Sequence, residues 1–308
     1  MQKKISVIGS GHIGSTAALK ILDKKLADVV LYDIVEGLPQ GLALDLAESS
    51  PVEGFEHKVL GTNNFNDTAN SDLFIITAGL TRKPGMTRED LLHKNADIMK
   101  GIVEKIKATS PNSIIIVVSN PLDIMAQLAL KVSGFKSNRV IGMAGILDSA
   151  RFRYFISEEL KVSPSEVEAM VLGGHGDAMV PLPKYTKVSG KLLSDLLPEA
   201  KIMALAERTR NGGAEVVNLL KTGSAYFAPA ASAVQMAESI LLDKKSTLPC
   251  AAYLTGQYGL NDVYIGVPVK LGKNGIEEII ELDLTKEELA ELKKSADIVK
   301  DNFNSLIR

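Results

Sequence analysis

The chain has 308 residues, of which 45% are hydrophobic and 23% charged, and its formal net charge is −2. This length and composition predict a globular protein that buries a substantial core, in two lobes. The nearly neutral charge gives no reason to expect nucleic acid or a membrane surface as a partner, and no segment approaches the length of a membrane span. The single cysteine, Cys250, excludes an internal disulfide and a cysteine-rich metal site. No bound metal is expected, and a reducing cytoplasm is the simplest location.

The first predicted element is a short buried strand at residues 5–8, which leads directly into a glycine-rich turn. A helix is predicted from about residue 15 to residue 25. A second strand, at residues 29–32, ends in Asp33. Strand, Gly-x-Gly-x-x-Gly turn, helix, strand and acid in this order form the fingerprint of a dinucleotide-binding unit.

Each part of this fingerprint has a physical reason. Gly9 permits a tight turn, Gly11 lets a pyrophosphate approach the backbone, and Gly14 lets the helix pack closely on the strand. The helix N-terminus offers free N–H groups and a positive dipole end to phosphates. Asp33 can accept hydrogen bonds from both ribose hydroxyls of an adenosine, and its charge would repel a 2′-phosphate. The sequence therefore predicts NAD rather than NADP.

The rest of the first half alternates predicted strands and helices. Apolar runs without polar alternation are typical of parallel strands that helices cover on both faces. The predicted strands are 59–62, 72–79 and 113–119, and the predicted helices are 36–50 and 90–109. We therefore expect a doubly wound, Rossmann-type α/β sheet domain over residues 1–143.

The second half predicts an α+β substrate-binding, catalytic domain over residues 144–308. Thr285 and Glu288 form a predicted capping box at the start of the last helix. The other predicted helices are 149–160, 202–220 and 225–242, and the predicted strands are 167–172, 250–255, 264–271 and 276–280. No linker divides the two halves, so we expect one rigid unit with the active site in the seam.

Catalytic groups in open α/β sheets gather just past the carboxyl ends of the strands. One candidate is the basic loop at residues 78–88, which could be an ordinary solvated loop or a hinged lid. Another is Asn120, followed by a proline. A third is His175, which lies in a glycine-rich turn that exposes it well. A histidine there suits a general base, which needs a carboxylate to orient it. Asp148 and Asp177 are both candidates, and their spacing does not decide between them.

These motifs together resemble the NAD-dependent malate/lactate dehydrogenase family, and within it the lactate-dehydrogenase-like branch that acts on malate. The resemblance runs from residue 3 to about residue 308. It depends on five motifs in the family's order: Gly9 to Gly14 with Asp33, the loop 78–88, Ser119-Asn120-Pro121, Leu147-Asp148-Ser149-Ala150-Arg151, and Gly173-Gly174-His175-Gly176-Asp177.

The resemblance implies a role for each candidate residue. His175 would accept the proton, Asp148 would orient it, and Arg151 would bind the C1 carboxylate of a small dicarboxylate, malate or oxaloacetate. Arg88 would polarise the C2 oxygen. Ser224 lies in a segment matched to the substrate pocket, and Asn120 is matched to both substrate and cofactor. The full set expected to bind NAD is Gly9, Ser10, Gly11, His12, Ile13, Gly14, Asp33, Asn95, Val118, Ser119 and Asn120. The family also implies a homo-oligomer, either a tetramer or a dimer.

Arg82 is expected to set the choice of substrate. In the family, the side chain at this loop position faces the group attached to C3 of the substrate. An arginine there suits a substrate with a second carboxylate. An unpaired guanidinium closed over pyruvate would cost several kcal/mol, whereas oxaloacetate brings its own counter-charge. The alternatives are a lactate or other 2-hydroxy acid dehydrogenase and, more remotely, a non-catalytic NAD-binding regulator.

Overall fold

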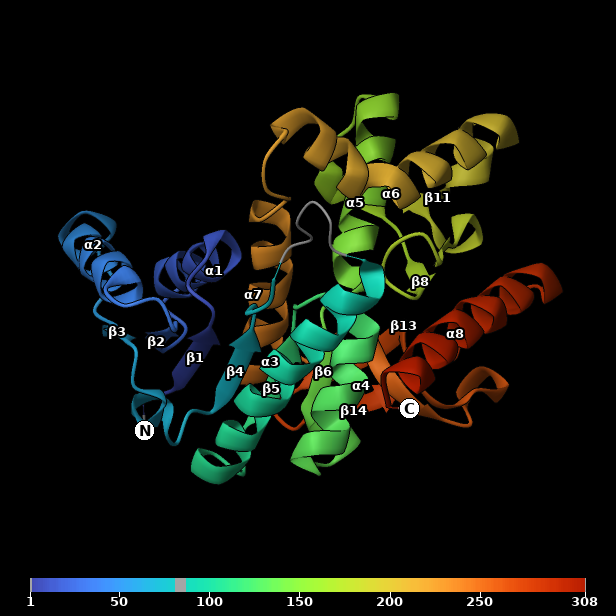
Figure 1. Ribbon diagram of the computed structural model, residues 1–308. Helices are drawn as coiled ribbons and strands as arrows, with labels where there is room; N and C mark the ends of the chain where they lie inside the picture. Colours follow the sequence, from blue (N-terminus) through green and yellow to red (C-terminus); the bar gives the residue numbers. More distant parts are fainter. Residues whose placement is uncertain (1, 81–86, 308) are drawn as a thin grey trace. The chain divides into compact units, whose positions relative to one another are not determined.

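The computed structural model describes residues 2–80 and 87–307. The chain forms two compact units, which Figure 1 colours along the sequence. The first unit comprises Met1–Met143, Tyr226–Ser246 and Leu271–Glu277, and the second comprises Ala144–Ala225, Thr247–Lys270 and Glu278–Arg308. The chain thus returns twice to the first unit after residue 143. The predicted single boundary at that residue does not account for these two returning segments. The first return carries helix α7 (Phe227–Leu241), which packs against helix α1 (His12–Asp23).

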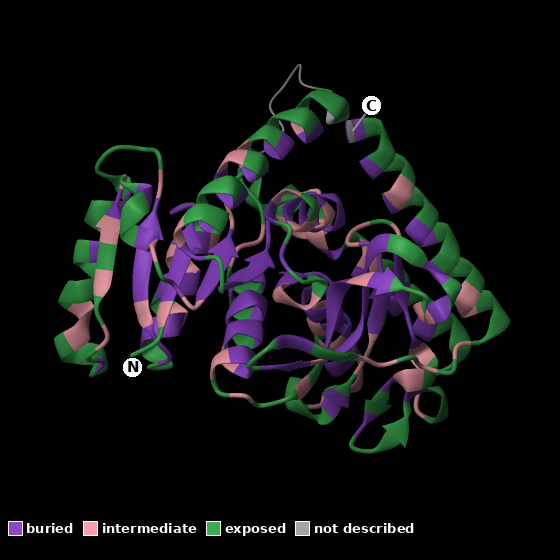
Figure 2. Ribbon diagram, turned by 90° about the horizontal axis from the view of Figure 1, so that it is seen from below, coloured by how far each residue is buried: buried purple, intermediate pink, exposed green. Residues whose placement is uncertain are grey.

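The first unit is built on a parallel sheet in the strand order β3-β2-β1-β4-β5-β6. This order confirms the predicted doubly wound, Rossmann-type sheet, in which ligands bind beyond the carboxyl ends of the strands. Every residue of β4 and β5 is buried, as their unbroken apolar sequences predict (Figure 2). The strands are β1 (Lys4–Ile8), β2 (Asp28–Tyr32), β3 (Val59–Thr62), β4 (Leu73–Ile76), β5 (Ile114–Val117) and β6 (Val140–Gly142).

Helices cover this sheet and complete the first unit. Besides α1 and α7 they are α2 (Leu38–Glu53), α3 (Arg88–Thr109) and α4 (Leu122–Ser133). Helix α1 begins at His12 rather than at the predicted residue 15, so the last residues of the glycine-rich turn form its first turn. The predictions did not include α4 or β6. Helix α4 is largely buried, and its nearly continuous apolar sequence hides the helical period.

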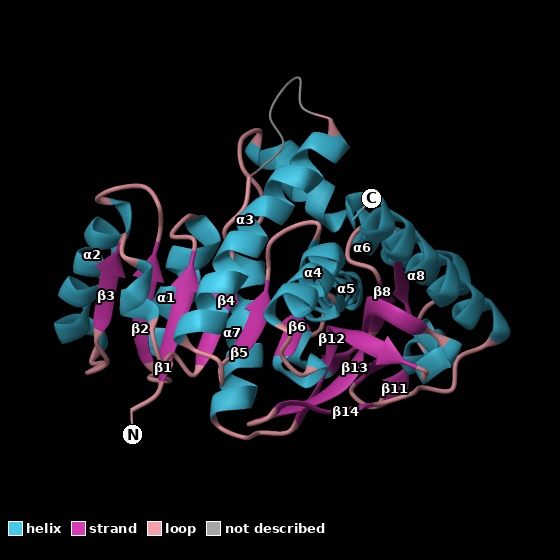
Figure 3. Ribbon diagram, turned by 60° about the horizontal axis from the view of Figure 1, so that its bottom comes forward, coloured by secondary structure: helices cyan, strands magenta, loops and turns pink. Residues whose placement is uncertain are grey.

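The second unit contains a sheet in the order β12-β13-β8-β9, in which β13, β8 and β9 are antiparallel (Figure 3). The strands are β12 (Ser246–Thr255), β13 (Asn261–Gly272), β8 (Val171–Gly173) and β9 (Met179–Pro181), and β14 (Gly275–Ile279) follows β13 after a tight turn. A small separate sheet has the order β11-β10-β7, with β7 (Val167–Glu168), β10 (Lys187–Val188) and β11 (Lys191–Leu192).

The predicted single strand at 167–172 is wrong. The chain leaves one sheet after Glu168 and enters the other at Val171, so this stretch contributes to both β7 and β8. At the break, the Val171 N–H donates to the Ser149 hydroxyl at 2.9 Å. An apolar run has the same pattern whether it forms one strand or two in succession, so periodicity could not show the break.

Three long helices complete the second unit: α5 (Gly145–Leu160), α6 (Glu199–Leu220) and α8 (Lys286–Ile307). The predicted capping box of α8 is confirmed. The Glu288 N–H donates to the Thr285 hydroxyl at 3.1 Å, and the Thr285 N–H donates to the Glu288 carboxylate at 2.8 Å. No helix in the described part of the chain combines the length and the apolar character that crossing a bilayer requires.

Candidate active site

The glycine-rich turn after β1 has the shape that a pyrophosphate requires. Gly9 has a φ of +100°, and a Cβ there would lie 2.7 Å from the backbone nitrogen of Ala78. A Cβ on Gly14 would lie 1.8 Å from the carbonyl oxygen of Gly9. Both positions therefore require glycine. A Cβ on Gly11, by contrast, would meet no atom of the described residues within 4 Å beyond its chain neighbours, so this face of the turn is open to a ligand.

The N-terminus of α1 faces the same turn. The first intrahelical hydrogen bond runs from the Ser15 N–H to the Gly11 carbonyl at 2.9 Å, so helix geometry leaves the N–H groups of His12 and Ile13 without an intrahelical acceptor. The first turn carries no acidic residue that would compete for them. The Ser10 hydroxyl is buried and has no hydrogen-bond partner among the described residues. These features fit a dinucleotide pyrophosphate.

Asp33 follows β2, and its carboxylate accepts one backbone N–H from the glycine-rich turn and one from its own segment. Its Oδ2 accepts the Ser10 N–H at 2.7 Å, and its Oδ1 accepts the Val35 N–H at 3.0 Å. Each carboxylate oxygen keeps a further lone pair, so the side chain can still accept from a ribose. The ring of His12 stacks on Tyr226 at a centroid distance of 5.0 Å, which leaves its backbone as the part directed to the turn.

The carboxyl end of β5 carries three of the expected cofactor residues. Val118 and Ser119 are buried, whereas Asn120 is exposed. The Ser119 hydroxyl donates to the carbonyl oxygen of Ala78 at 2.5 Å, which fixes the end of β5 against the segment that follows β4. Asn120 is thereby presented to solvent at the edge where the fold places ligands.

Asn95, on α3, is buried and its amide is engaged with backbone. Its Oδ1 accepts the Leu80 N–H at 2.7 Å, and its Nδ2 donates to the Asn120 carbonyl oxygen at 2.9 Å. The side chain therefore joins the segment after β4 to the segment after β5. This geometry suits a residue that positions Asn120. Such a role is less direct than the contact with the cofactor that the sequence predicts for Asn95.

Asp148 and His175 form the central pair of the second unit. Asp148 lies in the first turn of α5 and is only 1% exposed. Its Oδ2 lies 2.9 Å from Nδ1 of His175. Asp148 is thus the carboxylate that contacts the ring, and Asp177, the alternative that spacing left open, is an exposed residue of the adjoining turn. An ionised carboxylate only accepts hydrogen bonds, so the contact places the proton on Nδ1 and leaves Nε2 as the basic nitrogen.

Arg151 lies one helical turn after Asp148. Its Nη1 is 3.5 Å from Oδ1 of Asp148, and its side chain is 15% exposed. Burial lowers the pKa of the Arg151 guanidinium, and the charge of Asp148 opposes that shift. Because Asp148 makes its shorter contact with His175, the guanidinium retains donors that can bind a ligand's carboxylate.

Two glycines of α6 make room for Arg151, and the sequence predictions did not include them. A Cβ on Gly212 would lie 3.0 Å from Cδ of Arg151, and one on Gly213 would lie 3.6 Å from its Nη2. Glycine costs about 1 kcal/mol in a helix interior relative to alanine. Adjacent glycines inside the predicted helix 202–220 were therefore the signal that a neighbour needs this space.

The remaining predicted substrate residues are Ser224, Arg88 and Arg82. Ser224 is exposed, in the segment between α6 and α7. Arg88 is the first residue of α3, whose N-cap, Thr87, forms a capping box with Asp90. Arg82 lies outside the described residues.

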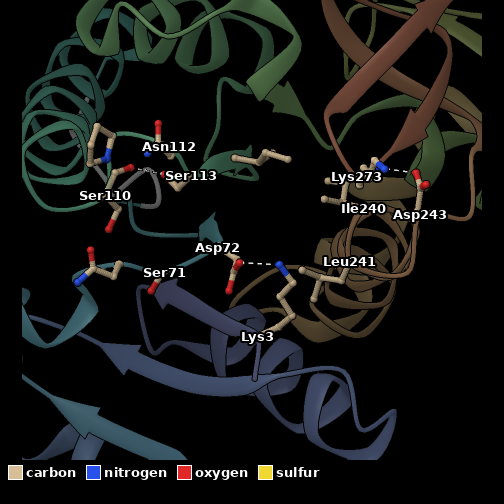
Figure 4. A pocket seen from close by; sticks show the side chains of 13 residues that line it. Lys3, Ser71, Asp72, Ser110, Asn112, Ser113, Ile240, Leu241, Asp243 and Lys273 are labelled. Atoms are coloured by element: carbon tan, nitrogen blue, oxygen red, sulfur yellow. Dashed lines mark hydrogen bonds and ion pairs between the residues drawn. The ribbon is translucent and has the colours of Figure 1, made fainter. Parts of the chain in front are cut away.

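A pocket of about 480 Å³ lies elsewhere in the first unit, at the amino ends of β4 and β5. Figure 4 shows two contacts among its lining residues: the Lys3 ammonium donates to Asp72 at 2.8 Å, and the backbone N–H of Lys273 donates to Asp243 at 3.0 Å. None of the predicted site residues lines it. In residues 2–80 and 87–307, no group of histidine, cysteine, aspartate and glutamate side chains is arranged to hold a metal ion.

Known proteins of one family match almost the full length of the chain. Residues 3–142 match the family model of the lactate/malate dehydrogenase NAD binding domain, and residues 146–307 match that of the lactate/malate dehydrogenase alpha/beta C-terminal domain. The malate dehydrogenase of Chlorobium limicola is 59% identical over 304 residues, which are 98% of each chain.

Solved structures of both kinds of enzyme are similar to this chain. The malate dehydrogenase from Picrophilus torridus in its apo form is 47% identical, with a TM-score of 0.97 over 99% of this chain and 98% of that one. The lactate dehydrogenase from Cryptosporidium parvum, complexed with lactic acid and nicotinamide adenine dinucleotide, is 46% identical, with a TM-score of 0.97 over 100% of this chain and 99% of that one. With both of its domains matched, the chain belongs to the lactate/malate dehydrogenase family.

Proposed function

We propose that this protein is an NAD-dependent malate dehydrogenase that interconverts (S)-malate and oxaloacetate. The observation that carries the proposal is the contact of one buried carboxylate, Asp148, with both His175 and Arg151. A base and a carboxylate-binding group fixed side by side are what a 2-hydroxy acid oxidation needs. Relatives named malate dehydrogenase, such as that of Chlorobium limicola, match the chain almost end to end.

His175 accepts the substrate's hydroxyl proton at Nε2 during oxidation and donates it back during reduction. The Asp148 contact at 2.9 Å holds the imidazole in the required tautomer and stabilises the imidazolium that forms. Asp148 is buried, so its charge acts on the imidazolium with little screening by water.

Arg151 binds the C1 carboxylate of the substrate through two parallel hydrogen bonds. Such a bidentate contact fixes both the position and the orientation of C2. The partial burial of the guanidinium strengthens the interaction, because fewer water molecules compete for its donors. Asn120 and Ser224 are the other polar groups proposed to contact the substrate.

NAD would supply the acceptor for the hydride that leaves C2 of malate. In this chain, Gly11 and the N-terminus of α1 are the groups proposed to hold its pyrophosphate, with Asp33 on the adenosine ribose. Ser10, Ile13, Val118 and Ser119 complete that side of the site. The negative charge of Asp33 disfavours the 2′-phosphate of NADP.

Arg82 and Arg88 are proposed to act on the substrate's other oxygens. Arg88 polarises the C2 carbonyl during reduction, and Arg82 binds the second carboxylate of oxaloacetate. The second candidate function is that of a lactate dehydrogenase. The similarity of the chain to the lactate dehydrogenase from Cryptosporidium parvum supports this alternative. Arg82 argues against it, because pyruvate has only a methyl group to offer to a guanidinium.

The protein is also proposed to form a homo-oligomer in the cytoplasm. Apolar side chains stand exposed on helices of each unit: Leu44 (61%) and Val52 (86%) on α2, and Met203 (53%) and Leu219 (76%) on α6. A partner subunit that covered contiguous apolar surface on these helices would bury such side chains.

The test is NADH oxidation with oxaloacetate by the wild-type protein and by His175→Asn. The wild type should turn over oxaloacetate, and the variant should lose roughly 10²–10⁴-fold in kcat, the usual contribution of a general acid–base group. Tight NADH binding without turnover of any 2-keto acid would instead indicate a non-catalytic NAD-binding regulator.

A further inference from the structure

Ser295, on α8, contacts both ends of the turn that carries His175. Its side chain is buried, at 2% exposure. Its hydroxyl donates to the carbonyl oxygen of Ala178 at 2.7 Å and accepts the N–H of Gly174 at 2.8 Å. One side chain from the C-terminal helix therefore closes the backbone loop in which His175 lies.

The loop itself needs such a constraint. Gly173 and Gly176 have φ values of +87° and +115°, a region that glycine enters freely but that it does not favour over other conformations. A Cβ on Gly173 would lie 2.8 Å from the Ala178 carbonyl oxygen and 3.1 Å from the Ser295 hydroxyl. Glycine is thus required for the close approach of Ser295, and the flexibility it brings must be restrained by another contact.

We propose that Ser295 is a positioning residue for His175, an inference that rests on the proposed function. Asp148, from α5, holds the imidazole of His175, and Ser295, from α8, holds the backbone on both sides of that residue, at Gly174 and Ala178. Without the second contact, Nε2 of His175 would sample positions away from the substrate's hydroxyl group.

This role predicts a loss in kcat rather than in KM. Proton transfer requires the base within about 2.6–3.2 Å of the hydroxyl oxygen, and a displacement of about 1 Å can cost 10²-fold in rate. The hydrogen bonds of Ser295 go to Gly174 and Ala178 and not to Arg151, the proposed carboxylate-binding group, so affinity for the substrate should change little.

The chain offers a closely matched control in Ser239, on α7. This serine is 1% exposed, and its hydroxyl donates to the Leu271 carbonyl oxygen at 2.7 Å and accepts the Ser246 N–H at 3.3 Å. It makes the same pair of backbone contacts in the first unit, in a segment without any proposed catalytic residue. Replacing either serine by alanine therefore removes the hydroxyl partner of one backbone N–H and one backbone carbonyl.

The experiment compares Ser295→Ala, Ser239→Ala and the wild type by thermal unfolding and by steady-state reduction of oxaloacetate with NADH, well below each Tm. Both variants should unfold at lower temperature. Ser295→Ala should lose roughly 10–100-fold in kcat with KM within about threefold, while Ser239→Ala keeps kcat within about twofold. Unchanged kcat in Ser295→Ala, or equal losses in both variants, would overturn the proposal.

Two further results keep the outcome interpretable. If Ser295→Ala does not fold, Ser295→Cys retains a weaker donor and acceptor and should lower kcat about 3–10-fold, and an unchanged kcat there contradicts the proposal. Absence of oxaloacetate reduction by the wild type would instead reject the proposed function, which separates the two failures.

Discussion

Asp148 Oδ2 lies 2.9 Å from His175 Nδ1, and the carboxylate that makes this contact is almost completely buried. Bulk water therefore does not compete with the imidazole for the Asp148 carboxylate. The same carboxylate reaches Arg151 through its other oxygen at 3.5 Å, so one buried charge orients both the proposed base and the proposed substrate-binding group.

Asp148→Asn is expected to lower kcat by roughly 10²–10⁴-fold, because a neutral amide cannot stabilise the imidazolium and can hold the wrong tautomer. Steady-state kinetics with oxaloacetate and NADH measure the loss. Asp177→Asn is the matched control, since that exposed carboxylate was the alternative partner; its kcat should stay within about twofold. A large loss in Asp177→Asn and none in Asp148→Asn would reverse the assignment.

Arg151→Lys should raise KM for oxaloacetate about 10–100-fold, because a lysine keeps the charge but makes no bidentate contact with a carboxylate. NADH affinity, followed by fluorescence titration, should change by less than about twofold, since Arg151 is proposed to bind only the substrate. The assignment fails if KM is unchanged while NADH binding weakens.

Asp33→Asn should narrow the preference for NADH over NADPH by about 10-fold or more, because the substitution removes a charge that repels the 2′-phosphate. The amide oxygen can still accept the Ser10 N–H, a bond that measures 2.7 Å with the carboxylate. The ratio of kcat/KM for the two coenzymes reports the change. An unaltered ratio would show that another residue sets the preference.

Gly212→Ala should make the protein more stable and at the same time a poorer enzyme. Alanine favours a helix interior over glycine by about 0.5–1 kcal/mol. The new methyl would stand 3.0 Å from Cδ of Arg151, so the guanidinium must move. We expect a KM for oxaloacetate raised about 3–10-fold, which corresponds to roughly 0.7–1.4 kcal/mol.

Gly101→Ala, in α3, is the control for this substitution. A Cβ at that position would meet no atom of the described residues within 4 Å beyond its own helix backbone. Thermal unfolding and kinetics should show a similar gain in stability with KM unchanged. If Gly212→Ala also leaves KM unchanged, the glycine has no part in placing Arg151.

Much of this architecture could be read from the sequence, because the first unit obeys local rules. The buried strands β4 and β5 and the glycine-rich turn depend on burial and on backbone geometry, which leave clear patterns. The change of sheet between β7 and β8 and the return of α7 to the first unit depend on contacts between distant segments. No local pattern encodes such contacts.

The candidate site shows the same division. His175 and Asp148 could be named from motifs, yet only the structure shows which carboxylate contacts the imidazole. Ser295 lies far from His175 in the sequence and has no motif of its own, so its hydrogen bonds across the loop could not be predicted. Gly212 left a signal, the adjacent glycines inside a helix, whose meaning depended on knowing where Arg151 lies.

The most direct test of the account is the ratio of kcat/KM for oxaloacetate and pyruvate, measured with NADH on the wild-type protein and on Arg82→Gln. The wild type should prefer oxaloacetate by a factor of about 10³ or more, because a guanidinium enclosed without a counter-charge costs several kcal/mol. Arg82→Gln should shift the preference toward pyruvate. Comparable kcat/KM for the two acids in the wild type would contradict the assignment as a malate dehydrogenase.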